Sequence, residues 1–335
     1  MKKKSRPSNS TRKRGGFPET APPPPKGGMR PVASGAQSPG SPQSPGALPS
    51  PGAPASRAKN ENQKSQIPQS LPLGRGVTII ASDPNGLIAF NKPAGILSHP
   101  NIGSDRPRSL LAARYNSDEE FYECGAPPAR RAFPAAGGKL RPAAPATSQS
   151  GFKIWLLNRL DSATSGVILA ATNEKLAREI RALFQARRVR KTYIALVFGV
   201  PQQPAQIWRD TLAIDKSHGQ IRASTRSGNI PSETRMQLLR AHRDSAAGTP
   251  VSLLQLEPST GRSHQLRVQC AKRRLPIIGD ATYGNFRDNR DFARLVRDKR
   301  LFLHSFETQF EYAHEGRAHT FSARAELPAV FAAWR

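Results

Sequence analysis

The prolines of this chain are concentrated at its beginning, and this distribution limits how much of it can fold. Fifteen of the 31 prolines lie in residues 1–72 of the 335-residue sequence, and the few apolar residues there follow no period of 2 or 3.6. Such a segment buries too little apolar surface to offset the entropy lost on ordering. We therefore expect a disordered Pro/Ser/Gly-rich basic tail over residues 1–72 and one folded domain over residues 73–335.

Both parts of the chain are basic. The tail carries a net charge of +10 and the remaining residues a net charge of +17, which together give the formal +27 of the whole sequence. A basic excess in both parts favours a polyanionic partner, above all nucleic acid. The tail itself has two interpretations, a non-specific tether to RNA phosphates or a solvated segment without a role.

Several classes of protein are excluded. The sequence contains no run of about 18 apolar residues, which a membrane helix needs, and no apolar signal-peptide region follows its basic start. Cys124 and Cys270 lie far apart and outside any CxxC pattern, which excludes a disulfide framework and a zinc ribbon. No GxGxxG or GxxxxGK[ST] motif follows a predicted strand, which disfavours dinucleotide and ATP enzymes. We expect a cytoplasmic protein without a metal site.

Short apolar runs bounded by turn residues predict mostly strands after Gly76. The spacing of Leu176, Ile180 and Leu183 predicts one helix with a basic opposite face, and a second helix follows Ser263 as a possible N-cap. We also expect a short helix at 109–115 and a mobile loop at 123–150. The fold class is therefore α+β, a largely antiparallel mixed sheet with flanking helices.

Four short motifs combine charged or aromatic residues with turn signals. They are NKPAG at 91–95, NRLDSATSG at 158–166, RKTY at 190–193 and TGRSHQLR at 260–267. The RLD tripeptide lies between two apolar runs, so its charges must be on a loop or at a strand end. The arginines at the start of the second helix favour an anion. Taken singly, each motif has an ordinary explanation, such as a surface ion pair or a packed tyrosine.

Taken together, the motifs resemble those of the RluA-type family of RNA pseudouridine synthases. That family has a KPaG segment, HRLDxxTSG, a KxY strand and TGRxHQxR, followed by an apolar stretch ending in xGDxxYG. This chain continues with LPIIGDATYG at 275–284 and LHS at 303–305. The motifs occur in the family's order, and the resemblance extends from about residue 76 to the C-terminus.

The resemblance implies a pseudouridine synthase fold and the isomerisation of uridines in structured RNA, with no cofactor. It implies that Asp161 is the catalytic nucleophile or base, that Arg267 is its ion-pair partner and that Tyr193 packs on the target base. The residues expected to contact RNA are Arg159, which would fill the space left by a flipped base, and Arg262, His264 and Lys191.

Two positions depart from the family pattern, and some alternatives stay open. Asn158 and Gln269 stand where the family often has histidine, although Asp161 is intact. The alternative function is a non-catalytic RNA-binding or ribosome-associated protein on the same scaffold. Ribosomal and transfer RNA are both possible substrates, and we expect the protein to act as a monomer.

Overall fold

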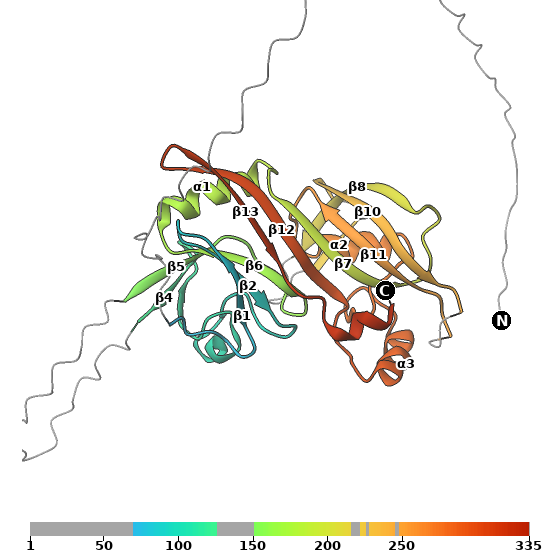
Figure 1. Cartoon of the computed structure of the whole chain (residues 1–335). Helices are drawn as coiled ribbons and strands as arrows, with labels where there is room; N and C mark the ends of the chain where they lie inside the picture. The colour runs from blue at the N-terminus through green and yellow to red at the C-terminus, as the bar shows by residue number, and fades with distance from the viewer. Residues whose placement is uncertain (1–69, 126–150, 216–221, 226–227, 245–247, 335) are drawn as a thin grey trace, which may run out of the picture. The chain divides into compact units, whose positions relative to one another are not determined.

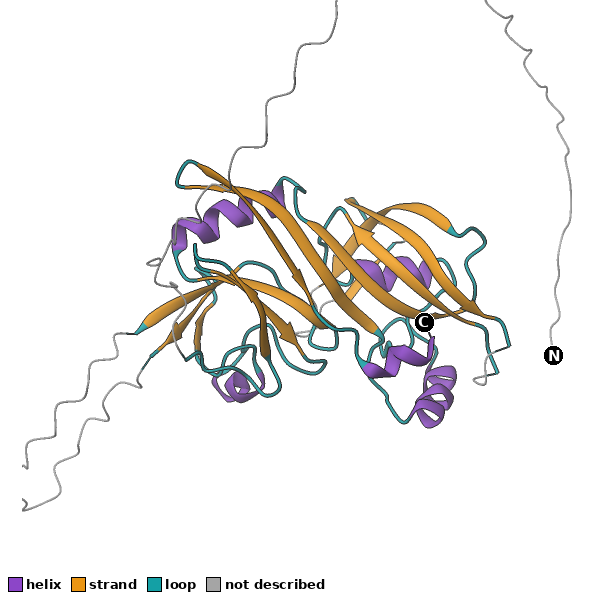
Figure 2. Cartoon of the chain, viewed as in Figure 1, coloured by secondary structure: helices purple, strands orange, loops and turns teal. Residues whose placement is uncertain are grey.

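The computed structural model describes residues 70–125, 151–215, 222–225, 228–244 and 248–334, all within one compact unit (Figure 1). Almost all of the predicted tail at 1–72 and most of the predicted loop at 123–150 lie outside these ranges. The described residues form mainly strands, with a few helices (Figure 2). This agrees with the predicted α+β class and with the largely antiparallel sheet.

The strands of the first half of the chain carry the segments around the RLD motif. They and the intervening helices are β1 (Thr78–Ser82), β2 (Leu87–Lys92), the 3-10 helix η1 (Gly103–Arg108), β3 (Arg114–Asn116), β4 (Phe121–Cys124), β5 (Phe152–Leu156), β6 (Ser165–Ala171), α1 (Glu174–Gln185) and β7 (Arg190–Phe198).

The second half supplies the remaining strands and the helix that contains Arg267. Its elements are β8 (Ala205–Asp215), β9 (Arg222–Ser224), β10 (Ile230–His242), β11 (Val251–Pro258), α2 (Gln265–Lys272), α3 (Phe286–Val296), β12 (Leu303–His314), β13 (Arg317–Arg324) and the 3-10 helix η2 (Ala329–Trp334).

The strands of the described residues join into one 13-stranded sheet. Its main path runs β3-β4-β5-β6-β12-β7-β11-β10-β8-β9, with β2 beside β6, β1 beside β2 and β13 beside β12. All seven residues of β6 are buried, as expected for an apolar run at the centre of a sheet. Among the pairs described, only that of β6 with β12 is parallel. This pair joins the first and second halves of the chain.

The helices cover apolar faces of the sheet. Leu176, Ala177 and Ile180 of α1 pack on residues of β6, β12 and β13, which confirms the predicted apolar face of this helix. Leu266 and Cys270 of α2 pack on β7, β8, β10 and β11. Both cysteines are buried free thiols. The sheet and α2 therefore share one core, and Arg267 projects from the edge of that core.

Three local predictions were wrong in whole or in part. Residues 109–115 are not a helix: η1 ends just before them, and Leu111 and Ser109 form bridges with Leu73 and Leu97. Pairing with these neighbouring segments outweighs the helix propensity of leucine and alanine. Ser263 is not the N-cap of α2, because His264 occupies that position in the left-handed conformation without a side-chain cap. The predicted loop at 123–150 also begins inside β4, which ends at Cys124.

Gly166 allows β6 to approach β12 directly after the RLD motif. Its φ is +108°, and a Cβ atom built on it would lie 2.1 Å from the carbonyl oxygen of Ser305. Only glycine satisfies both the conformation and the contact. Gly316 provides a comparison, since it also has a positive φ (+75°) but nothing within 4 Å of a built Cβ.

We predict that Gly166→Ala lowers the free energy of unfolding by about 2 kcal/mol or more, because it adds a backbone clash to the conformational strain. Gly316→Ala should lower the free energy of unfolding by less, since it adds conformational strain without a backbone clash. Urea denaturation of the two variants measures the difference. Equal midpoints would contradict the assignment of a close approach at Gly166.

Candidate active site

A cleft of about 1720 Å³ opens where the loop after β5, the beginning of β7 and the segments on both sides of α2 meet. Every side chain that the sequence singled out as catalytic or RNA-binding lines this cleft. These residues are Arg159, Asp161, Lys191, Tyr193, Arg262, His264 and Arg267. Residues more than 100 positions apart in the sequence are thus brought to one concave surface.

Arg267 connects the two carboxylates of the site. Its Nη1 donates to Oδ2 of Asp161 at 3.0 Å. On the other side its Nε and Nη2 donate to the two carboxylate oxygens of Asp280, each at 2.8 Å. The side chain of Asp280 is fully buried, that of Arg267 is 9% exposed and that of Asp161 is 28% exposed. The arginine therefore joins a buried carboxylate to one that reaches the cleft.

The charges of this triad support one another. Burial by itself would lower the pKa of Arg267, but the bonds to Asp280 and the charge of Asp161 hold it above its usual value. Burial likewise opposes ionisation of Asp280, yet the Arg267 guanidinium and the backbone N–H groups of Tyr283 and Thr282 hold its pKa below the usual range. At neutral pH both members of the buried pair are charged.

His264 faces the same oxygen of Asp161 as Arg267 does. Its Nε2 lies 3.7 Å from Oδ2 of Asp161, and its Nδ1 lies 2.9 Å from the hydroxyl of Tyr283. Burial lowers the pKa of His264, which keeps the ring neutral at pH 7. The Tyr283 hydroxyl accepts the N–H of Ala223, so its own hydrogen is available to Nδ1. This assignment leaves the proton on Nε2, the nitrogen that faces Asp161.

The loop that carries Asp161 is fixed by side-chain hydrogen bonds to β6 and to the segment after β2. The Asn158 carboxamide oxygen accepts the backbone N–H of Leu169 in β6 at 2.8 Å. The Ser98 hydroxyl donates to the Leu160 carbonyl at 2.7 Å and accepts the Leu160 N–H at 2.9 Å. Asn158 therefore has a structural role in this chain, since its oxygen supplies the acceptor that links the loop to the sheet.

Lys92 of the NKPAG motif also supports the loop that carries Asp161. Its ammonium is buried and donates to the carbonyl oxygens of Ile96 (2.6 Å), Ser162 (3.0 Å) and Pro93 (3.1 Å). Burial lowers its pKa to about 7, while the charge of Asp161 acts in the opposite direction. The motif thus holds Ser162, the residue that follows Asp161.

Tyr193 lies between two core clusters and also reaches the cleft. Burial, followed by the charge of Asp161 and against a hydrogen bond with Ser305, raises its pKa to about 12. The hydroxyl therefore stays protonated at neutral pH and can donate a hydrogen bond but cannot act as a base.

The cations on the wall of the cleft differ in depth. Arg159 and Arg262 are exposed, so their guanidinium groups are accessible to a polyanion. Lys191 is partly buried, and burial lowers its pKa to about 8. The Arg262 Nε donates to the backbone carbonyl of Pro231 at 3.5 Å. Among the described residues, the side chains of Arg159 and Lys191 have no hydrogen bond or ion pair.

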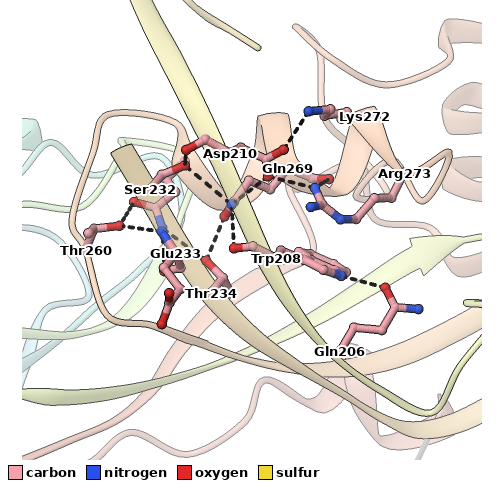
Figure 3. A network of polar contacts seen from close by, with 11 residues as sticks. Gln206, Trp208, Asp210, Ser232, Glu233, Thr234, Thr260, Gln269, Lys272 and Arg273 are labelled. Carbon is pink, nitrogen blue, oxygen red and sulfur yellow. Dashed lines mark hydrogen bonds and ion pairs between the residues drawn. The ribbon is translucent and has the colours of Figure 1, made fainter. Parts of the chain in front are cut away.

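A polar network fixes α2, and thereby Arg267, on the sheet (Figure 3). Gln269 is fully buried; its Nε2 donates to Asp210 at 2.9 Å, and its Oε1 accepts from Thr234 at 2.7 Å. Asp210 is also bonded by Lys272 (2.7 Å) and Arg273 (2.9 Å). Gln269 stands two residues after Arg267, and its bonds to β8 and β10 fix the position of the helix.

Sequence reasoning missed three supporting residues: Lys92, Asp280 and Tyr283. All three lie inside motifs that the resemblance included, NKPAG and LPIIGDATYG. The sequence motif does not reveal that the carboxylate of Asp280 is buried. Among the described residues there is no group of three or more His, Cys, Asp or Glu side chains able to hold a metal ion, and no helix is long and apolar enough to cross a membrane.

We predict that Asp280→Ala lowers the free energy of unfolding by about 3–5 kcal/mol, because it leaves the buried Arg267 cation without its main partner. Asp161→Ala is the matched control, since it removes a partly exposed carboxylate from the same arginine and should lose far less. Chemical denaturation of both variants makes the comparison. Equal losses would show that Asp280 is not the buried anchor of Arg267.

Comparisons with known proteins identify the family of this chain. The family described as RNA pseudouridylate synthase matches residues 86–272. A "tRNA pseudouridine synthase C" of Vibrio cholerae is 33% identical over 68% of this chain and 83% of its own length. A protein of the same name from Yersinia pestis is 33% identical over 54% of this chain and 72% of its own length.

The chain is also similar to two mammalian proteins of one name. The mouse "RNA pseudouridylate synthase domain-containing protein 1" is 33% identical over 53% of this chain and 57% of its own length. The solved structure of the human protein of that name covers 80% of this chain and 90% of its own, with a TM-score of 0.52 and 23% identity, which shows a shared fold. From its sequence and its fold, this chain belongs to the RNA pseudouridylate synthase family, the enzymes that isomerise uridine in RNA.

Proposed function

We propose that this chain converts specific uridines of structured RNA to pseudouridine, with Asp161 as the catalytic nucleophile or base. The observation that carries the proposal is the partly exposed Asp161 carboxylate, bonded to a buried guanidinium in a cleft large enough for RNA. The reaction breaks the bond from N1 to the ribose C1′ and forms a bond from C5 to C1′. The proton lost from C5 is balanced by one gained at N1, so no oxidant or reductant is consumed.

Asp161 meets two requirements of this chemistry. Its Oδ2 accepts from Arg267 and faces His264, which holds the carboxylate in one orientation. Within the described residues its Oδ1 has no hydrogen-bond partner from the protein, so this oxygen is available to the ribose or the base.

Tyr193 is the residue we assign to packing on the target base. Its side chain packs against two core clusters and also lines the cleft, and a pKa of about 12 keeps its hydroxyl protonated. The face of the ring stacks on the uracil, and the hydroxyl can donate a hydrogen bond to a charge that develops there.

The remaining residues of the cleft are assigned to the RNA. Arg262 and Lys191 contact phosphates, which position the substrate, and Arg159 fills the space left when the uridine is turned out of its stack. His264 contacts the flipped nucleotide beside Asp161. The names of two relatives favour transfer RNA as the substrate, with ribosomal RNA as the second candidate. We further propose a cytoplasmic enzyme that acts as a monomer and needs no cofactor.

The proposal predicts that Asp161→Asn abolishes pseudouridine formation while RNA binding persists. The amide preserves the shape of the side chain but cannot serve as a nucleophile or base. Pseudouridine formed in RNA from cells that lack the gene would be measured beside filter binding of the same RNA. Wild-type turnover by the variant would refute the role of Asp161.

The same experiment separates the enzyme from its alternative. A non-catalytic RNA-binding protein on this scaffold would bind RNA but form no pseudouridine even as the wild-type chain. The partly exposed Asp161 carboxylate in the cleft favours the enzyme, because a binding protein would not need a carboxylate facing the RNA.

A further inference from the structure

Phe286 is exposed at the edge of the cleft. Its side chain is 75% exposed, the highest value among the large apolar residues that the structure describes. It is also among the residues that line the cleft around Asp161 and Arg267. A single exposed apolar side chain is common on protein surfaces, so exposure alone does not indicate a ligand. Phe286 is distinguished by its place in the lining of the cleft, where a contact with a bound base would bury its ring.

The backbone of Phe286 is fixed relative to the catalytic pair. Phe286 is the first residue of α3, and the Asn285 side chain caps that helix by accepting the N–H of Arg287 at 2.9 Å. One turn later, the Asn289 side chain accepts the Gly279 N–H at 2.8 Å and donates to the Asp280 carbonyl at 3.1 Å. The segment that presents Phe286 is therefore tied to the residue that holds Arg267.

The charge around Phe286 suits a polyanion. Arg287 and Arg290 lie in the first turns of α3, and within the described residues neither has a carboxylate within 4.0 Å, whereas Arg294 of the same helix pairs with Asp291. The cleft is also larger than the about 300–1,000 Å³ of small-molecule sites, which leaves room for nucleotides beside the target. Aromatic rings next to cations are the means by which proteins hold unpaired bases.

We propose that Phe286 stacks on an unpaired base next to the target uridine, and that it selects RNA in which this neighbouring base is free to unstack. The inference rests on the proposed function, since it places the RNA in the cleft. A protein partner that binds the apolar ring is the alternative. An unchanged affinity for RNA in Phe286→Ala would favour that alternative. Leu295 is the matched control for the loss of an exposed apolar side chain, because it is 45% exposed on the same helix but lines a separate cavity with Val296 and Trp334.

The test compares Phe286→Ala, Phe286→Trp and Leu295→Ala in the full chain. The substrate is total RNA from cells that lack the gene, and the rate of pseudouridine formation is measured against RNA concentration. We expect Phe286→Ala to raise the apparent KM about tenfold with a smaller change in kcat, as expected for the loss of one stacked base. Phe286→Trp should restore the KM, and Leu295→Ala should match the wild type.

A binding measurement keeps this inference separate from the proposed function. The Kd for a fluorescein-labelled single-stranded oligouridylate should rise about tenfold in Phe286→Ala and recover in Phe286→Trp, whether or not pseudouridine is formed. If the wild-type chain forms none, the proposed function fails, and this Kd alone decides the role of Phe286. An unchanged Kd in Phe286→Ala, a Trp variant as weak as the Ala variant, or an equal loss in Leu295→Ala would overturn the inference.

Discussion

The buried ion pair between Arg267 and Asp280 is the interaction on which the site depends. Both carboxylate oxygens of Asp280 accept hydrogen bonds from the guanidinium of Arg267, and both side chains are almost fully buried. Such a pair costs desolvation, and its geometry must be close to ideal to offset that cost. What it achieves here is orientation: the third nitrogen, Nη1, points to Asp161 at the wall of the cleft. The buried ion pair thus sets the position of the accessible Asp161 carboxylate.

The rest of the fold fixes the loop that contains Asp161 and the helix that contains Arg267. Gly166 lets β6 meet β12, which fixes the loop that contains Asp161 against the half of the chain that supplies Arg267. Lys92 bonds the carbonyl of Ser162, and Gln269 fixes α2 on β8 and β10. Each of these contacts joins segments far apart in sequence, so the site exists only when the whole sheet is folded.

Much of this architecture could be predicted from the sequence. Apolar periodicity predicted α1 and the central strands, and the order of the motifs identified the residues that line the cleft. Sequence reasoning failed where tertiary pairing overrode local preference, as at residues 109–115, which pair with Leu73 and Leu97 in place of forming a helix. It also missed the supporting roles of Lys92 and Asp280, because burial of a charged side chain depends on neighbours that periodicity does not encode.

The central claim is that the carboxylate held by Arg267 acts on uridines of RNA. The most direct measurement is a pseudouridine map of total RNA from cells with the gene, without it, and with the Asp161→Asn gene restored. The account predicts that one or a few pseudouridines disappear on deletion, return with the wild-type gene and stay absent with the variant. A map that is the same in all cells, or one that the variant restores, would contradict it.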